Sequence, residues 1–134
     1  MNLNLKNMFN RVRKPKKIPF YVFSKTLQDK LIELGYKKSE SGNRTYFSLF
    51  YYNKKEHLIP EYYHYFYIES YYENIGFANN NENNPDGCWH GFSRPEDFTK
   101  ENLDELFERA TTYAIDSKKR RIQIKLDEIG KDFE

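Results

Sequence analysis

The strongest constraint on the fold is a run of tyrosines in the middle of the chain. Nine of the twelve tyrosines lie between Tyr46 and Tyr72, and most of these fall in residues 61–72. In a β-strand, alternate residues point to opposite faces. At that period one face carries the apolar residues Phe66 and Ile68, and the other carries Tyr63, Tyr65, Tyr67, Glu69 and Tyr71. The segment therefore predicts a strand with a core face and a tyrosine face.

The tyrosine face is a poor candidate for a core. Each buried phenol hydroxyl needs a hydrogen-bond partner, and no aliphatic residue accompanies these rings. A half-exposed surface suits them better, because tyrosine combines an apolar ring with a polar tip. We expect this face to be exposed and to bind a partner, and coverage by a helix is the alternative. The predicted contact residues are Tyr63, Tyr65, Tyr67, Tyr71 and Glu69.

The flanking sequence predicts an antiparallel, aromatic-rich sheet of about five strands. Short runs rich in aromatic and β-branched residues, separated by turn-forming residues, indicate strands joined by hairpins. A polar loop over residues 79–87 would join the last two strands. The candidate strands cover residues 18–23, 36–39, 44–52, a segment from residue 61, and a hairpin of 75–78 with 88–92.

An early, short helix is predicted over residues 25–34. Ser24 precedes this segment as a candidate N-cap, and Gly35 follows it as a helix-ending residue. Leu27, Leu31 and Leu34 recur at the spacing of one helix face.

A longer helix is predicted in the C-terminal third. Phe98, Thr99 and Leu103 match the hydrophobic staple that marks the start of a helix. Helical spacing continues to about Ile129, and Gly130 is the expected stop. A break near residue 117 and a terminal strand are the alternatives. The expected fold is α+β, with both helices packed on one face of the sheet.

The charge distribution divides the chain into a basic N-terminal arm, residues 1–17, and a single α+β domain, residues 18–134. Residues 1–38 hold ten Lys and Arg against two Asp and Glu, whereas residues 39–98 hold four against nine. A basic arm often binds an anionic partner, and a solvated terminus is the alternative. The predicted basic patch combines the arm with a run on the late helix: Arg11, Arg13, Lys14, Lys16, Lys17, Lys118, Lys119, Arg120 and Arg121.

Composition and motif searches exclude several functional classes. Hydrophobic residues make up 38% of the chain, and no apolar run approaches the ~18 residues of a spanning helix. The single cysteine excludes an internal disulfide and fits a reducing compartment, so we expect a cytoplasmic protein. Cys88 and His90 supply at most half of a zinc site, and they do not form a nucleophile pair with an orienting residue. We expect no metal, no cofactor and no catalytic residue.

Two functional hypotheses lead, and an enzyme with an unrecognised site is the third and least favoured. The first is a non-catalytic protein-binding module of the inhibitor, immunity or adaptor type, because aromatic surface with mixed charge is favoured at interfaces. The alternative is single-stranded nucleic-acid binding, with aromatic rings stacking on bases and basic residues on phosphates. The net acidic sheet region places protein binding first. Oligomeric state does not follow from the sequence.

Overall fold

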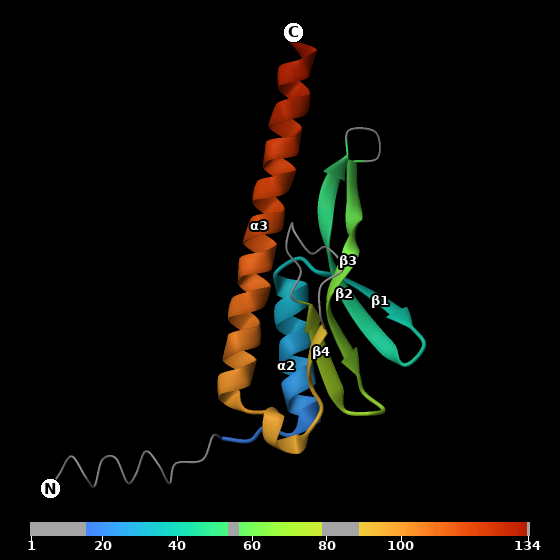
Figure 1. Ribbon diagram of the computed structural model, residues 1–134, viewed down its shortest axis with the longest axis vertical. Coiled ribbons are helices and arrows are strands. Elements are labelled where there is room, and N and C mark those ends of the chain that lie inside the picture. Colours follow the sequence, from blue (N-terminus) through green and yellow to red (C-terminus); the bar gives the residue numbers. More distant parts are fainter. Residues whose placement is uncertain (1–15, 54–56, 79–88, 134) are drawn as a thin grey trace, which may run out of the picture.

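Two helices pack on one face of a five-stranded antiparallel sheet in the computed structural model (Figure 1). The structure describes residues 16–53, 57–78 and 89–133, and it describes residues 50–53, 57–64, 89 and 132 through their backbone alone. The predicted α+β architecture is confirmed. In chain order the elements are α2 (Phe20–Glu33), β1 (Lys37–Ser41), β2 (Arg44–Asn53), β3 (His57–Glu69), β4 (Asn74–Ala78), β5 (Trp89–Phe92), the 3-10 turn η1 (Pro95–Asp97) and α3 (Lys100–Asp132).

The aromatic segment at residues 18–23 is helical, so the strand predicted there is wrong. Helix α2 begins directly after Pro19, whose φ of −55° is already close to the helical value. Phe23 then precedes Leu27 and Leu31 at steps of four residues, and all three side chains are buried. The predicted N-cap, Ser24, lies inside the helix and donates a hydrogen bond to the carbonyl of Tyr21. The helix start therefore follows the spacing of the buried residues Phe23, Leu27 and Leu31 and not the position of the predicted cap, Ser24.

The predicted end of the first helix is confirmed. Gly35 has a φ of +94°, a conformation that favours glycine. Its N–H donates to the Ile32 carbonyl, and the Tyr36 N–H donates to the Leu31 carbonyl, each over 3.0 Å. These two bonds form a Schellman motif. The buried Tyr36 hydroxyl then donates to the Ala110 carbonyl of α3 over 2.8 Å, which links the connection after α2 to α3.

The sheet follows sequence order from β1 to β5, and its helix-facing side carries rows of apolar residues. Phe47 pairs with Phe66, which pairs with Phe77, and Ile68 pairs with Ile75 in the adjacent row. All five side chains are buried. They pack against the buried face of α2 and α3 to form one core. The expected hairpin between the last two strands is confirmed, because β4 and β5 pair antiparallel.

A β-bulge interrupts the alternation of β3. Phe47 pairs with Phe66, but the next residue, Ser48, pairs with His64, so β3 holds one extra residue, Tyr65. A bulge of this kind changes the direction in which the following side chains point. Tyr65 and Phe66 are consequently both buried, and both rings contact Tyr36, which lies between α2 and β1.

Helix α3 is continuous from Lys100 to Asp132. The Thr99 hydroxyl accepts a hydrogen bond from the Asn102 N–H over 3.2 Å, which confirms the predicted N-cap. The predicted stop at Gly130 is wrong, because the helix runs two residues beyond it. A glycine weakens a helix by about 1 kcal/mol without ending it unless it adopts a positive φ, which Gly130 does not. The alternatives of a break near Ser117 or a terminal strand are also excluded.

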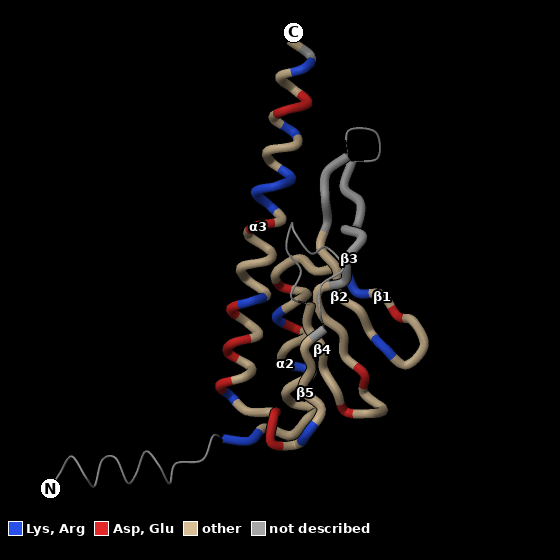
Figure 2. The backbone as a smooth tube through the Cα atoms, in the orientation of Figure 1, with Lys and Arg blue, Asp and Glu red and all other residues tan. Residues whose placement is uncertain are grey.

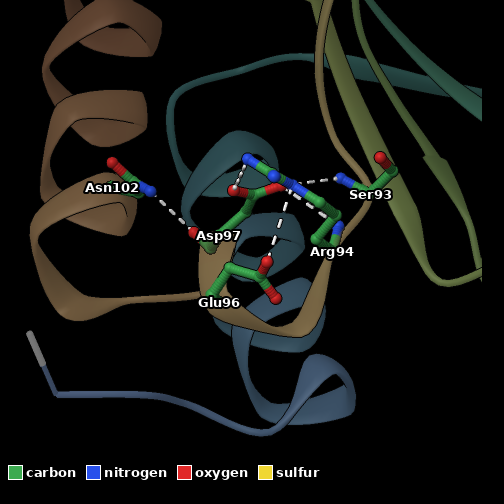
Figure 3. A network of polar contacts seen from close by, with 5 residues as sticks. All are labelled: Ser93, Arg94, Glu96, Asp97 and Asn102. Carbon is green, nitrogen blue, oxygen red and sulfur yellow. Dashed lines mark hydrogen bonds and ion pairs between the residues drawn. The ribbon is translucent and has the colours of Figure 1, made fainter.

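A polar network around Asp97 holds the connection from β5 to α3 (Figure 3). The Asp97 carboxylate accepts hydrogen bonds from the backbone N–H groups of Ser93 and Arg94, over 3.3 and 3.1 Å. The Asn102 side chain donates to the Asp97 carbonyl over 2.7 Å. The Arg94 guanidinium also lies 3.6 Å from Asp97 and 3.8 Å from Glu96. These bonds cap η1 and position the start of α3, so we assign the network to the fold.

The last residues of the predicted basic arm lie beside the start of α3. The Lys100 N–H donates to the Lys16 carbonyl over 3.1 Å, and the Ile18 N–H donates to the Phe98 carbonyl over 2.7 Å. Lys17 and Thr99 form an isolated antiparallel bridge. The backbone of residues 16–18 is therefore part of the fold, whereas residues 1–15 lie outside the described part of the chain.

Candidate binding surface

The structure divides the predicted tyrosine face between the core and the surface. Tyr65 is only 6% exposed and belongs to the core, so the expectation of an exposed row is wrong at this position. The bulge is the physical reason, because it turns the Tyr65 ring toward Tyr113 of α3, 5.2 Å away between centroids. Tyr67 is half-buried, Tyr71 is exposed, and the side chain of Tyr63 lies outside the described residues. The predicted core residues Phe66 and Ile68 are buried as expected.

Tyr67 lies in a compact cluster on the sheet face opposite the helices. Tyr46 pairs with Tyr67, and their ring centroids are 6.1 Å apart. The Arg44 guanidinium carbon lies 4.2 Å from the centre of the Tyr67 ring, a cation–π geometry. The Arg44 Nε donates to Glu69 over 2.9 Å, and the Asn74 amide donates to the other Glu69 oxygen over 2.8 Å. We call these five residues the Tyr67 cluster.

The Tyr67 cluster also fixes the ionisation of its charged pair. The hydrogen bond from Arg44 is the main reason why the pKa of Glu69 lies below its ordinary value of 4.5, and the Asn74 amide adds to this effect. The same hydrogen bond raises the pKa of Arg44. Glu69 was predicted as a contact residue, but its side chain is mostly covered and already paired. Its role in the structure is to hold Arg44 against Tyr67.

The lowered pKa of Glu69 predicts a specific acid sensitivity. The ionised carboxylate stabilises the folded state fully above pH 4.5, and this contribution is lost as the pH falls through the lower pKa of the folded protein. Chemical denaturation from pH 7 to pH 2.5 should therefore show wild type losing stability relative to Glu69→Gln only below about pH 5.

A thermodynamic cycle supplies the control for this acid effect. In an Arg44→Gln background, Glu69→Gln should alter the pH dependence much less, because the main cause of the shift is absent. An unchanged pH dependence for Glu69→Gln in the wild-type background would contradict the assignment.

A glycine creates the space that the Tyr67 ring occupies. Tyr67 pairs with Gly76 of β4, and a Cβ atom on Gly76 would lie 2.0 Å from the Tyr67 Cε1 atom. Only a residue without a side chain permits this ring position. Gly91 of β5 pairs with Gly76 in the same row. In the row that contains Tyr67, neither β4 nor β5 therefore carries a side chain beside the cluster.

Two exposed tyrosines lie on the turn that follows β3. Tyr71 and Tyr72 are 80% and 60% exposed, and their rings meet edge to face with centroids 4.8 Å apart. The Glu73 N–H donates to the Ser70 carbonyl, and Glu73 has a φ of +51°, which is uncommon for a residue with a side chain. The turn therefore begins one residue after Glu69 and presents two large rings to solvent beside the Tyr67 cluster.

The predicted basic residues that the structure describes do not form one patch. Lys16 and Lys17 lie at the start of α3, whereas Lys118, Lys119, Arg120 and Arg121 lie midway along it, about 28 Å away at 1.5 Å per residue (Figure 2). Four consecutive residues also point to different sides of a helix. The Arg120 guanidinium donates to the Tyr65 hydroxyl over 3.3 Å. Arg11, Arg13 and Lys14 lie outside the described residues.

Sequence reasoning missed Arg44 and Asn74 as members of the surface. Both are polar residues at strand ends, where such residues are ordinary, and only the pairing of β2, β3 and β4 brings them to Glu69. The turn at residues 40–43 marks Arg44 as the first residue of β2, but its pairing with the acidic residue that ends β3 depends on the register between β2 and β3. Strict alternation continued to residue 72 would place Tyr72 on the same face as Phe66 and Ile68, but β3 ends at Glu69.

The described residues contain no cluster of metal-binding side chains. No three His, Cys, Asp or Glu side chains among residues 16–49, 65–78 and 90–131 gather where they could hold an ion. His90 stacks on Phe77, with ring centroids 5.4 Å apart. Within the described ranges, no helix combines the length and the apolar character needed to cross a membrane. Comparison with protein-family models, with curated proteins and with solved structures finds no match to this chain.

Proposed function

We propose that this protein is a non-catalytic protein-binding module of the inhibitor, immunity or adaptor type. Its partner would contact the Tyr67 cluster and the adjacent turn that carries Tyr71 and Tyr72. The observation that carries the proposal is the exposure of these two rings on a turn held in a fixed conformation. Exposed, pre-ordered tyrosines are the residues that most often anchor protein interfaces.

The turn is suited to binding because little freedom is lost when a partner covers it. Each tyrosine has two rotatable side-chain bonds, and the two rings already contact each other. The Glu73 N–H to Ser70 carbonyl hydrogen bond and the positive φ of Glu73 fix the backbone beneath them. A left-handed conformation at a non-glycine residue costs about 1–2 kcal/mol, so its presence beside exposed rings supports a functional role for the turn.

The Tyr67 cluster would supply the polar part of the same interface. Arg44 is held by both Tyr67 and Glu69, and it retains a partly exposed guanidinium. An arginine that is already ordered can donate hydrogen bonds to a partner without a further loss of rotamer freedom. Aromatic rings around an ordered arginine are a common composition at the centre of interfaces.

The charge arrangement favours a protein partner over a nucleic acid. Glu73 lies on the turn itself and is exposed, and Glu69 lies next to Arg44, so phosphates approaching the rings would meet carboxylates. The described basic run at residues 118–121 lies on α3, in the helical layer on the other side of the sheet. Single-stranded nucleic-acid binding needs rings and cations along one path.

Affinity purification from the native cell, with and without nuclease, tests this proposal. We expect the tagged chain to retain a protein partner after nuclease treatment. Tyr71→Ala and Tyr72→Ala should each reduce the affinity for that partner about tenfold, because each removes a large ring from the centre of the contact. Isothermal titration calorimetry with the purified partner would measure the change.

The matched control is Tyr21→Ala on α2. Tyr21 is 74% exposed, close to the value for Tyr71, but it lies on a different element. This variant should bind the partner with unchanged affinity. Equal losses for Tyr21→Ala and Tyr71→Ala would place the interface elsewhere, and retention that disappears with nuclease would favour the nucleic-acid alternative.

A further inference from the structure

The C-terminal half of α3 carries an exposed apolar seam. Ile115, Ile122, Leu126, Ile129 and the C-cap residue Phe133 are all 44–86% exposed. Together with Lys119 they recur at alternating steps of four and three residues, which is the heptad spacing of a coiled coil. We call these six residues the α3 seam. Isolated exposed apolar residues are ordinary, but a heptad row of them on one helix marks an association surface.

The α3 seam faces away from the protein's own sheet. The core-facing side of α3 is defined by Leu106, Ala110 and Ser117, all of which are fully buried. At 100° per residue the seam lies about 160° around the helix from this buried side. The sheet therefore cannot cover the seam, and the upper half of α3 extends beyond α2 in Figure 1.

We propose that two copies of this chain associate through antiparallel pairing of their α3 seams. With the axis of symmetry at Ile124, every seam position meets another seam position: Ile122 lies opposite Leu126 of the second copy, Ile115 opposite Phe133, and Lys119 opposite Ile129. Each of these pairs combines an a position of one helix with a d position of the other, as an antiparallel two-stranded coiled coil requires. The Lys119 stem packs on Ile129 and its ammonium group reaches solvent.

Charge determines the antiparallel orientation. Lys119 is the one charged residue among the six of the α3 seam, because residues 118–121 point to different sides of the helix and Arg120 donates to Tyr65 of its own sheet. In the antiparallel register, Lys119 of one copy lies opposite the apolar Ile129 of the other, so the two Lys119 ammonium groups are kept apart. A parallel pair would place Lys119 opposite Lys119 of the second copy inside the seam, where the two like charges repel each other.

The size of the seam and the shape of the chain also fit a second copy. The five exposed apolar side chains leave on the order of 500 Å² per copy, so the pair buries about 1,000 Å², near the lower limit for a specific interface. Antiparallel pairing places the two sheets at opposite ends of the helix pair, where they do not collide. We therefore infer a reversible dimer with a dissociation constant in the micromolar range, formed independently of the tyrosine surface.

Sedimentation equilibrium of the full chain between about 1 and 500 μM tests the association. Wild type should show a concentration-dependent dimer, and Ile122→Glu should raise the dissociation constant at least tenfold by burying a charge in the seam. The matched control is Ile32→Glu on α2, because Ile32 and Ile122 are 49% and 50% exposed. This control should dimerise as wild type does.

Disulfide formation tests the orientation. With Cys88 replaced by serine, a mixture of Ile122→Cys and Leu126→Cys chains should form the mixed disulfide in preference to either homodimer, since only antiparallel pairing brings these positions together. Three results would overturn the proposal: a monomer at every concentration, a dimer insensitive to Ile122→Glu, or a preference for the disulfide between two Ile122→Cys chains.

Discussion

Replacing Phe66 by alanine is expected to lower the free energy of unfolding by about 3–5 kcal/mol. The Phe66 ring is fully buried, between Phe47 and Phe77 in the sheet and against Tyr36 and Tyr113. Removing it deletes a large apolar side chain and leaves a cavity. The cavity cannot close, because hydrogen bonds between the five strands hold the backbone in place. Urea denaturation followed by circular dichroism measures the change.

Two controls in the same strand and turn make this result specific. Tyr65→Phe keeps the buried ring and removes only the hydroxyl that accepts from Arg120, so it should cost no more than about 1 kcal/mol. Tyr71→Ala removes an exposed ring of similar size and should change stability by about 0.5 kcal/mol or less. If Phe66→Ala is no more costly than Tyr71→Ala, the core does not lie on this face of β3.

The contrast between Tyr65 and Phe66 shows where sequence reasoning succeeds and where it stops. Strict alternation correctly places Phe66 and Ile68 in the core, because pleating holds wherever the register is regular. It fails at Tyr65, since a bulge inserts one residue and no local sequence signal distinguishes this tyrosine from its neighbours. The helix and turn predictions based on Gly35 and Thr99 are confirmed, because caps depend on local backbone geometry.

The candidate surface depends on long-range pairing, and this limits how much of it a sequence can reveal. The tyrosines and Glu69 are visible as a pattern, but Arg44 joins them only because β2 and β3 pair in one particular register. Gly76 looks like an ordinary strand glycine until the Tyr67 ring is placed on it. Similarly, the aromatic run at the start of α2 satisfies both a strand pattern and a helix pattern, and packing against α3 selects the helix.

Gly76→Ala is expected to destabilise the protein by about 2 kcal/mol and to displace Tyr67. The new Cβ would lie within 2.0–2.7 Å of three atoms of the Tyr67 ring, so the ring has to move. Moving it separates Tyr67 from Arg44 and from Tyr46, and each of these contacts contributes on the order of 1 kcal/mol. Denaturation experiments measure the loss, and the ring-current shift of the residue 76 α-protons should disappear in NMR spectra.

The companion substitutions separate the steric conflict from a general effect of alanine. Gly91→Ala changes the paired glycine of the same row, where the nearest neighbour is a carbonyl oxygen 3.4 Å away, and it should be neutral or slightly stabilising. In a Tyr67→Ala background, Gly76→Ala should likewise cost little, because the obstructing ring is absent. The double-mutant cycle should therefore return a coupling energy of about 2 kcal/mol between residues 67 and 76. Additive costs would mean that Tyr67 does not lie over Gly76, and the binding surface would then lack its central ring.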